Sequence, residues 1–172
     1  MKFLHISDLH IGKYVNGYRM LDDQRYMLER IVEIIKEKNP DALLIAGDIY
    51  DKSLPSAEAV ELFDSFMTEI AGLHGKTGLK TFVISGNHDS PEWIGYFNKL
   101  IELNGIFTDG VFEGVARKNT VECDGEKVNI FSLPFIRPSF VRKVYPEESA
   151  KITDYTTAVR VVLEHSDINA DD

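Results

Sequence analysis

The sequence predicts an α/β fold with a mostly parallel sheet, and three observations indicate it. Three short apolar runs, at 2–6, 42–46 and 80–84, have the length and aliphatic content of buried strands. Amphipathic helical patterns separate these runs, and each run stops abruptly at polar residues. Because strands that alternate with helices form parallel sheets, we expect the polar turns to meet at the carboxyl edge of one sheet.

The first part of the chain is expected to contain three helices that cover this sheet. The first spans about 22–38 and carries an apolar stripe on one face. The second begins after the N-cap Ser56 and is closed by Gly72 and Gly75. The third is expected over about 91–103, with proline at its first position and a broad apolar stripe.

Short β-rich segments follow from Gly105. Asp124-Gly125 lies between two of them and is a strong hairpin signal. A last helix is expected over about 154–165. We therefore expect a second sheet that faces the first, with helices outside.

The polar residues at the three strand ends are candidate metal ligands. The donors are oxygen and imidazole groups without a thiolate, a set that suits two divalent transition metals bridged by a carboxylate such as Asp48. They are Asp8, His10, Asp48, Asn87 and His88. Any one turn by itself could be a polar loop with a helix-capping histidine. The ordered set D-x-H, G-D-x-x-D and G-N-H-D, each directly after a strand, predicts a metal site.

This set resembles the calcineurin-like metallophosphoesterase superfamily. Less specific features resemble the SbcD-type DNA repair nuclease subunits of this superfamily. They are the continuation His10-Ile11-Gly12, Arg25 with the helix that follows it, and the turn Leu133-Pro134-Phe135. The resemblance covers essentially the whole chain. It implies a four-layer sandwich of two facing sheets with helices outside, and a metal-dependent exonuclease or endonuclease that hydrolyses DNA in double-strand-break repair or hairpin processing.

The resemblance also implies roles for the site residues. It implies two divalent ions, of which Mn²⁺ is the expected metal, with ligands Asp8, His10, Asp48 and Asn87. His88 matches the catalytic histidine of the family and would give the leaving group a proton. Asp89 is the expected partner that fixes the tautomer of His88.

Contacts with substrate and partners are expected at two further places. Lys13 and Arg19 lie in a tyrosine-containing loop after the first ligand turn, a mixture that suits DNA, although it equally suits an exposed loop packed on neighbouring helices. The resemblance implies an SbcC-like ATPase subunit as partner, and a homodimer. An apolar surplus on the second and third helices predicts that its two-fold interface contains Leu62, Phe66, Leu100 or Ile101.

Composition leaves alternatives open. The net charge is −9, which weakens attraction to nucleic acid, so a small phosphodiester or a phosphoprotein remains an alternative substrate. A non-catalytic scaffold of the same fold is a further alternative. No apolar stretch approaches the roughly 20 residues of a membrane span, and the single Cys123 cannot form an internal disulfide, so a cytoplasmic protein without a membrane partner is expected.

The later part of the family pattern is missing from the sequence. Members of this type take further ligands from a later histidine and a Gly-His-x-His turn, whereas the last histidine here, His165, falls in an expected helix. We therefore expect 1–172 to be the N-terminal portion of a metallophosphoesterase domain, without the C-terminal part of the second sheet. The chain itself is expected to be inactive, and its full-length parent to be a metal-dependent phosphodiesterase.

Overall fold

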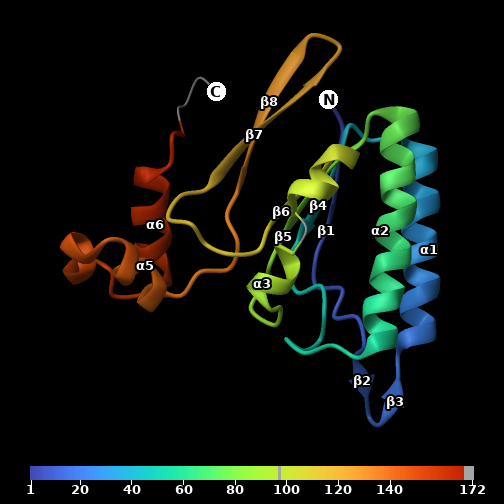
Figure 1. Cartoon of the computed structure of the whole chain (residues 1–172), viewed down its shortest axis with the longest axis horizontal. Helices are drawn as coiled ribbons and strands as arrows, with labels where there is room; N and C mark the ends of the chain where they lie inside the picture. Colours follow the sequence, from blue (N-terminus) through green and yellow to red (C-terminus); the bar gives the residue numbers. More distant parts are fainter. Residues whose placement is uncertain (97, 169–172) are drawn as a thin grey trace.

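The computed structural model describes residues 1–96 and 98–168, and these form an α/β sandwich (Figure 1). Its main sheet is parallel, in the order β1-β4-β5-β6. These strands are β1 (Phe3–Ile6), β4 (Ala42–Ala46), β5 (Lys80–Ile84) and β6 (Ile106–Asp109). The three apolar runs are therefore adjacent strands, as predicted, and the turns that follow them share one edge of the sheet.

Two long helices, α1 (Leu21–Lys38) and α2 (Ala57–Thr77), lie side by side over one face of the sheet (Figure 1). They bury their apolar stripes against β4 and β5 in the main core. Ser56 caps α2 as predicted, and its side chain accepts a hydrogen bond from the Ala59 amide at 3.3 Å. The expected end at Gly72 and Gly75 is wrong, because α2 continues to a left-handed cap at Gly78. Burial of Ile70 and Leu73 outweighs the helix-weakening effect of the two glycines.

The single helix expected over 91–103 is also wrong. The chain forms two one-turn helices, α3 (Pro91–Ile94) and α4 (Asn98–Ile101), followed by the 3₁₀ turn η1 (Glu102–Asn104). Gly95 ends α3, and Leu100 and Leu103 stay exposed. Little apolar surface is therefore buried here to hold a continuous helix against the cost of Gly95.

The other face of the sheet is covered by an antiparallel hairpin of β7 (Arg117–Cys123) and β8 (Glu126–Ser132). Its turn is Asp124-Gly125 as predicted, and both residues have positive φ, 51° and 79°. Val121 of the hairpin packs on Phe82 of the sheet in a small cluster of its own. The second layer of the sandwich is therefore two-stranded within the residues that the structure describes.

The last elements form a separate cluster beside the hairpin (Figure 1). They are α5 (Pro138–Val144), the 3₁₀ segment η2 (Pro146–Lys151) and α6 (Tyr155–His165). The expected last helix is confirmed, with a capping box between Asp154 and Thr157. Neither α5 nor η2 was expected from the sequence. No helix in the described part of the chain is long and apolar enough to cross a membrane.

A short hairpin of β2 (Tyr14–Val15) and β3 (Tyr18–Arg19) replaces the expected loop after the first ligand turn. Asn16 and Gly17 form its turn with φ of 51° and 84°, values that suit a two-residue hairpin turn. The Asn-Gly pair was the sequence signal for this hairpin.

The expected two-fold interface is corrected in part. Leu62 and Phe66 are each only 3% exposed, because they belong to the core between α2 and the sheet, so neither can lie at an interface. Leu100 is 61% exposed and remains a candidate.

Candidate metal centre

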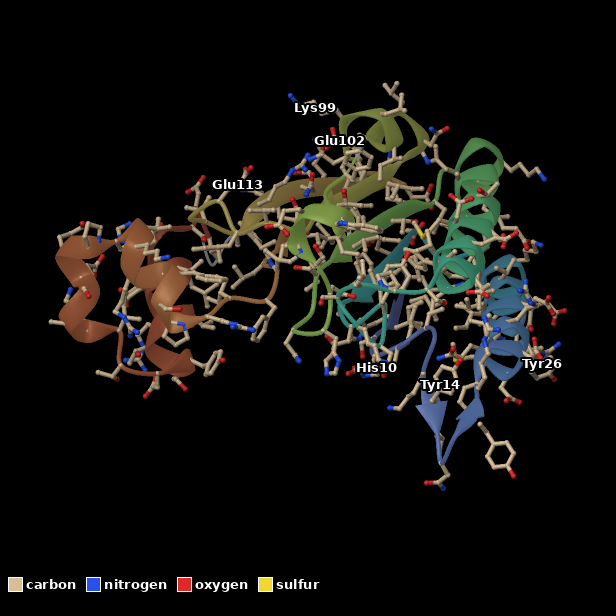
Figure 2. All side chains as sticks on the ribbon, turned by 60° about the horizontal axis from the view of Figure 1, so that its bottom comes forward. His10, Tyr14, Tyr26, Lys99, Glu102 and Glu113 are labelled. Atoms are coloured by element: carbon tan, nitrogen blue, oxygen red, sulfur yellow. The ribbon has the colours of Figure 1, made fainter. Side chains whose placement is uncertain are left out.

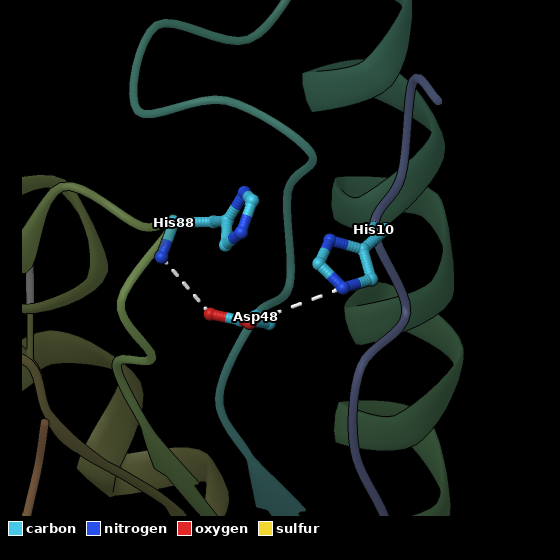
Figure 3. A group of neighbouring side chains, drawn as sticks. All are labelled: His10, Asp48 and His88. Atoms are coloured by element: carbon cyan, nitrogen blue, oxygen red, sulfur yellow. Dashed lines mark hydrogen bonds and ion pairs between the residues drawn. The ribbon is translucent and has the colours of Figure 1, made fainter. Parts of the chain in front are cut away.

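The three turns bring one side chain each to a common point, as Figure 3 shows for His10, Asp48 and His88. One ligand atom of each lies within 4.8 Å of the others. Nε2 of His10 is 3.9 Å from Oδ2 of Asp48, and the two imidazole rings meet edge to face with centroids 4.9 Å apart. Residues far apart in the sequence therefore form one cluster at the edge of the sheet.

The backbone is strained where these ligands lie. Asp8, His10 and Asp48 have positive φ values of 56°, 43° and 50°. Such a conformation costs a residue other than glycine about 1–3 kcal/mol. Hydrogen bonds between the turns hold it, since the amide of Asp8 donates to Gly47 O at 3.1 Å and the amide of His10 to Asp48 O at 2.9 Å. These sharp turns point the side chains toward one position. Strained backbone of this kind is common at binding sites.

Two glycines allow the second and third turns to approach each other. A Cβ on Gly47 would lie 2.7 Å from Gly86 Cα, and a Cβ on Gly86 would overlap the side chain of Asp48. Neither turn has room for a side chain at these positions. The close approach lets the His88 amide donate to Oδ1 of Asp48 at 3.0 Å, which fixes that carboxylate in the cluster.

Asp8 and Asn87 lie beside the cluster. Oδ1 of Asp8 is 4.0 Å from Nε2 of His10, and its Oδ2 accepts a hydrogen bond from Ser7 at 2.6 Å. Asn87 is exposed and lines a cavity of about 390 Å³ together with Asp8 and Asp48. All the expected metal ligands therefore come from the same edge of the sheet.

His88 is oriented by Asp51 and not by Asp89, which corrects the expectation from the sequence. Nδ1 of His88 lies 2.9 Å from the carbonyl oxygen of Asp51. A carbonyl can only accept, so Nδ1 carries the proton and Nε2 of neutral His88 has a free lone pair. The Asp51 carboxylate is also 3.8 Å from Nδ1 of His10. Asp51 is the last residue of the G-D-x-x-D motif, and that spacing was the signal for it.

Asp89 instead joins the second and third turns. It is 5% exposed, and its Oδ2 accepts from the amides of Gly86 at 2.8 Å and Ile49 at 3.2 Å, while Oδ1 accepts from the amide of Tyr50 at 3.0 Å. Burial, and then the nearby negative charges of Asp89 and Asp64, raise the pKa of Tyr50 to about 12. Asp89 therefore positions the turns that carry Asp48 and His88.

Gln24 holds the first turn and was missed from the sequence. Its buried side chain donates to the carbonyls of Leu9 at 3.1 Å and His10 at 2.7 Å, and accepts from the Gly12 amide at 2.9 Å. The signal was a polar residue on the buried stripe of α1, whose other buried members are Leu21, Leu28, Val32 and Ile35. A side chain on such a stripe that satisfies three backbone groups fixes the loop around it.

Lys13 and Arg19 stay predicted substrate contacts. Both are exposed, and the Arg19 guanidinium lies 3.6 Å from the Glu58 carboxylate. Arg19 and Tyr14 line a second cavity of about 340 Å³ that reaches Asp51. Figure 2 shows Tyr14 and His10 on the same side of the molecule.

The donor set fits a divalent transition metal. Oxygen and imidazole donors converge here without a thiolate. Among the described residues, Asp8 and Asp48 pair with His10 and not with a lysine or arginine. Nδ1 of His10 is buried without a hydrogen-bond partner and lies 3.8 Å from the Asp51 carboxylate, the kind of group that orients a metal-ligating imidazole when the two are hydrogen-bonded. A bound cation would therefore offset negative charge that the described side chains leave uncompensated.

An α/β sandwich with this cluster at the carboxyl edge of its parallel sheet fits a metal-dependent hydrolase. The model of the calcineurin-like phosphoesterase family matches residues 1–167. The chain belongs to this family of phosphoesterases.

Proposed function

We propose that the protein acts on phosphodiester bonds in DNA, as the nuclease subunit of an SbcD-type repair complex. The observation that supports a phosphodiesterase is the cluster of His10, Asp48 and His88, in which His88 is held through Nδ1 beside the metal ligands. The D-x-H-I-G motif and the Leu133-Pro134-Phe135 turn support the DNA substrate by resemblance.

In this proposal Asp8, His10, Asp48 and Asn87 hold two divalent ions, which are Mn²⁺ in the cell. Such ions supply Lewis-acid chemistry that offsets charge on the phosphate and activates water. The chain's own residues supply position and a proton. Gln24 and Asp89 hold the turns, and the carbonyl of Asp51 holds the His88 ring. When His88 is protonated, its Nε2–H donates to the leaving oxygen.

The partners proposed with this function are DNA, an SbcC-like ATPase subunit and a second copy of the chain, in the cytoplasm. The second candidate is an enzyme for a small phosphodiester or a phosphoprotein. The net charge of −9 and the pairing of Arg19 with Glu58 favour this alternative, because both reduce attraction to a polyanion. A non-catalytic scaffold is disfavoured by the converging ligands.

The test compares His88→Ala with the wild type in the full-length parent expected from the sequence. The variant should keep Mn²⁺ binding by calorimetry while turnover on linear DNA falls by about 10²–10⁴-fold, the usual effect of a positioned proton donor. His165→Ala is the control, since His165 lies on α6 and bonds to Glu148.

Wild-type hydrolysis of a bis-aryl phosphodiester without cleavage of DNA would favour the second candidate. Loss of Mn²⁺ from His88→Ala would show that His88 is a ligand and not the proton donor.

A further inference from the structure

The residues that line the cavity beside the metal centre are of two chemical kinds. Asp8, Asp48 and Asn87 are polar and come from the candidate metal centre. A second group is mainly apolar and includes Leu133, Pro134, Phe135, Ile136, Tyr155 and Val159. Phe135 and Tyr155 are its two rings, and we refer to this pair as the aromatic wall. Phe135 lies in the segment after β8, and Tyr155 lies at the start of α6. Neither residue has a role in the proposed metal binding or proton transfer.

The aromatic wall is fixed relative to the metal ligands. The Phe135 amide donates to the carbonyl of Ser85 at 2.9 Å, directly before the turn that carries Asn87. Tyr155 is the first residue of α6, and the Asp154 capping box sets where that helix begins. The two ring centroids are 6.1 Å apart with a tilt of 35°. The wall is therefore preformed, so a ligand would not have to order it.

The Tyr155 ring is also accessible. Tyr155 is 54% exposed, and Asp8, Ala46 and Asn87, which line the same cavity, are exposed as well. An exposed aromatic face beside a polar site can take a flat ligand by stacking.

The charges around the cavity decide what kind of group fits there. Among the described residues that line it, none is lysine or arginine. A second phosphate would therefore find no cationic partner at the wall, while a flat neutral ring would find aromatic and aliphatic contacts. Nucleobases are such rings, and stacking on aromatic side chains tolerates any base. The volume of about 390 Å³ lies within the range of small-molecule sites.

We propose that the aromatic wall binds the base of the nucleotide that carries the scissile phosphate. The substrate is then a phosphodiester with a nucleoside next to the reacting phosphorus, and its phosphate would bind at the divalent cations that Asp8, Asp48 and Asn87 would hold. This inference rests on the proposed phosphodiesterase function and deepens it, because it names a nucleoside as the group beside the reacting phosphate.

The test uses two substrates with the same leaving group, thymidine 5′-(p-nitrophenyl phosphate) and methyl p-nitrophenyl phosphate, with the full-length parent and Mn²⁺. Removal of a stacking ring, in Tyr155→Leu or Phe135→Leu, should raise KM for the thymidine ester by roughly 5- to 100-fold. KM for the methyl ester should not change. Tyr26→Leu is the matched control, since Tyr26 is an exposed tyrosine on α1, away from His10 (Figure 2).

A second readout does not depend on hydrolysis. In saturation-transfer NMR, the base protons of thymidine 5′-monophosphate should contact the wild type and Tyr26→Leu, and lose that contact in Tyr155→Leu. Equal KM changes for both esters, or no change for either, would overturn the inference while the hydrolytic function stands. If neither ester is hydrolysed, the proposed function fails. The NMR contact then decides the inference alone: its presence supports base binding at the aromatic wall, and its absence overturns it.

Discussion

Replacement of Asp89 by asparagine tests whether this residue positions the two turns or acts on His88. Asp89 accepts three backbone hydrogen bonds, two at Oδ2 and one at Oδ1. An asparagine side chain has only one acceptor oxygen. The orientation that keeps more bonds places this oxygen where it accepts from the Ile49 and Gly86 amides. The NH₂ group then points at the Tyr50 amide. One buried donor then loses its partner, and the two remaining bonds lose their charge.

The magnitude follows from these three bonds. A hydrogen bond to a charged group contributes about 1.5–3 kcal/mol, and a neutral one about 1 kcal/mol. Losing one bond and weakening two should lower the free energy of unfolding by about 3 kcal/mol. For a chain of this size that corresponds to a fall in Tm of roughly 6–12 °C.

The assay is urea unfolding of Asp89→Asn beside the wild type. Asp124→Asn is the control, because Asp124 is exposed in the β7–β8 turn and asparagine suits its left-handed conformation equally well. The control should change stability by less than about 0.5 kcal/mol. Unchanged stability of Asp89→Asn, together with a shifted pH profile of turnover in the full-length parent, would refute the positioning role and restore Asp89 as the partner of His88.

Three further predictions follow from the same structure. Gln24→Leu should weaken Mn²⁺ binding in the full-length parent by about 10- to 100-fold, because the first turn loses the side chain that holds it. A calorimetric Kd equal to that of the wild type would contradict this prediction. The 172-residue chain should bind at most one Mn²⁺, weakly, because Asp8, His10, Asp48 and Asn87 are too few to complete the coordination shells of two ions. Its melting temperature should rise little in Mn²⁺ near the Kd, where binding stabilises by about 0.4 kcal/mol, and a large rise would show a tighter site. Leu100→Asp should convert a dimer to a monomer in light scattering, and a monomeric wild type at high concentration would remove the proposed interface.

Local sequence patterns determined much of the fold. The three apolar runs are long enough for single strands, and polar residues at their ends predicted where ligands meet, because adjacent parallel strands share one carboxyl edge. Ser56, Asp124-Gly125 and the start of the last helix were readable since caps and tight turns depend on a few neighbouring residues. Packing decided the helix ends that were misjudged, as at Gly78, where burial outweighs local propensity.

The tertiary structure decided the connections around the site. Asp89 bonds to residues 39 and 40 positions away, and Gln24 to a turn 12 to 15 positions away. The sequence states which groups can accept or donate, but the choice between His88 and the Tyr50 amide as partner of Asp89 depends on where the folded backbone brings each of them. The same holds for the aromatic wall, because Phe135 and Tyr155 line the same cavity as the candidate metal ligands only in the folded chain, where the segment after β8 bonds to the end of β5. The sequence by itself therefore predicted the candidate metal ligands, while long-range packing determined what orients their side chains and what lies beside them.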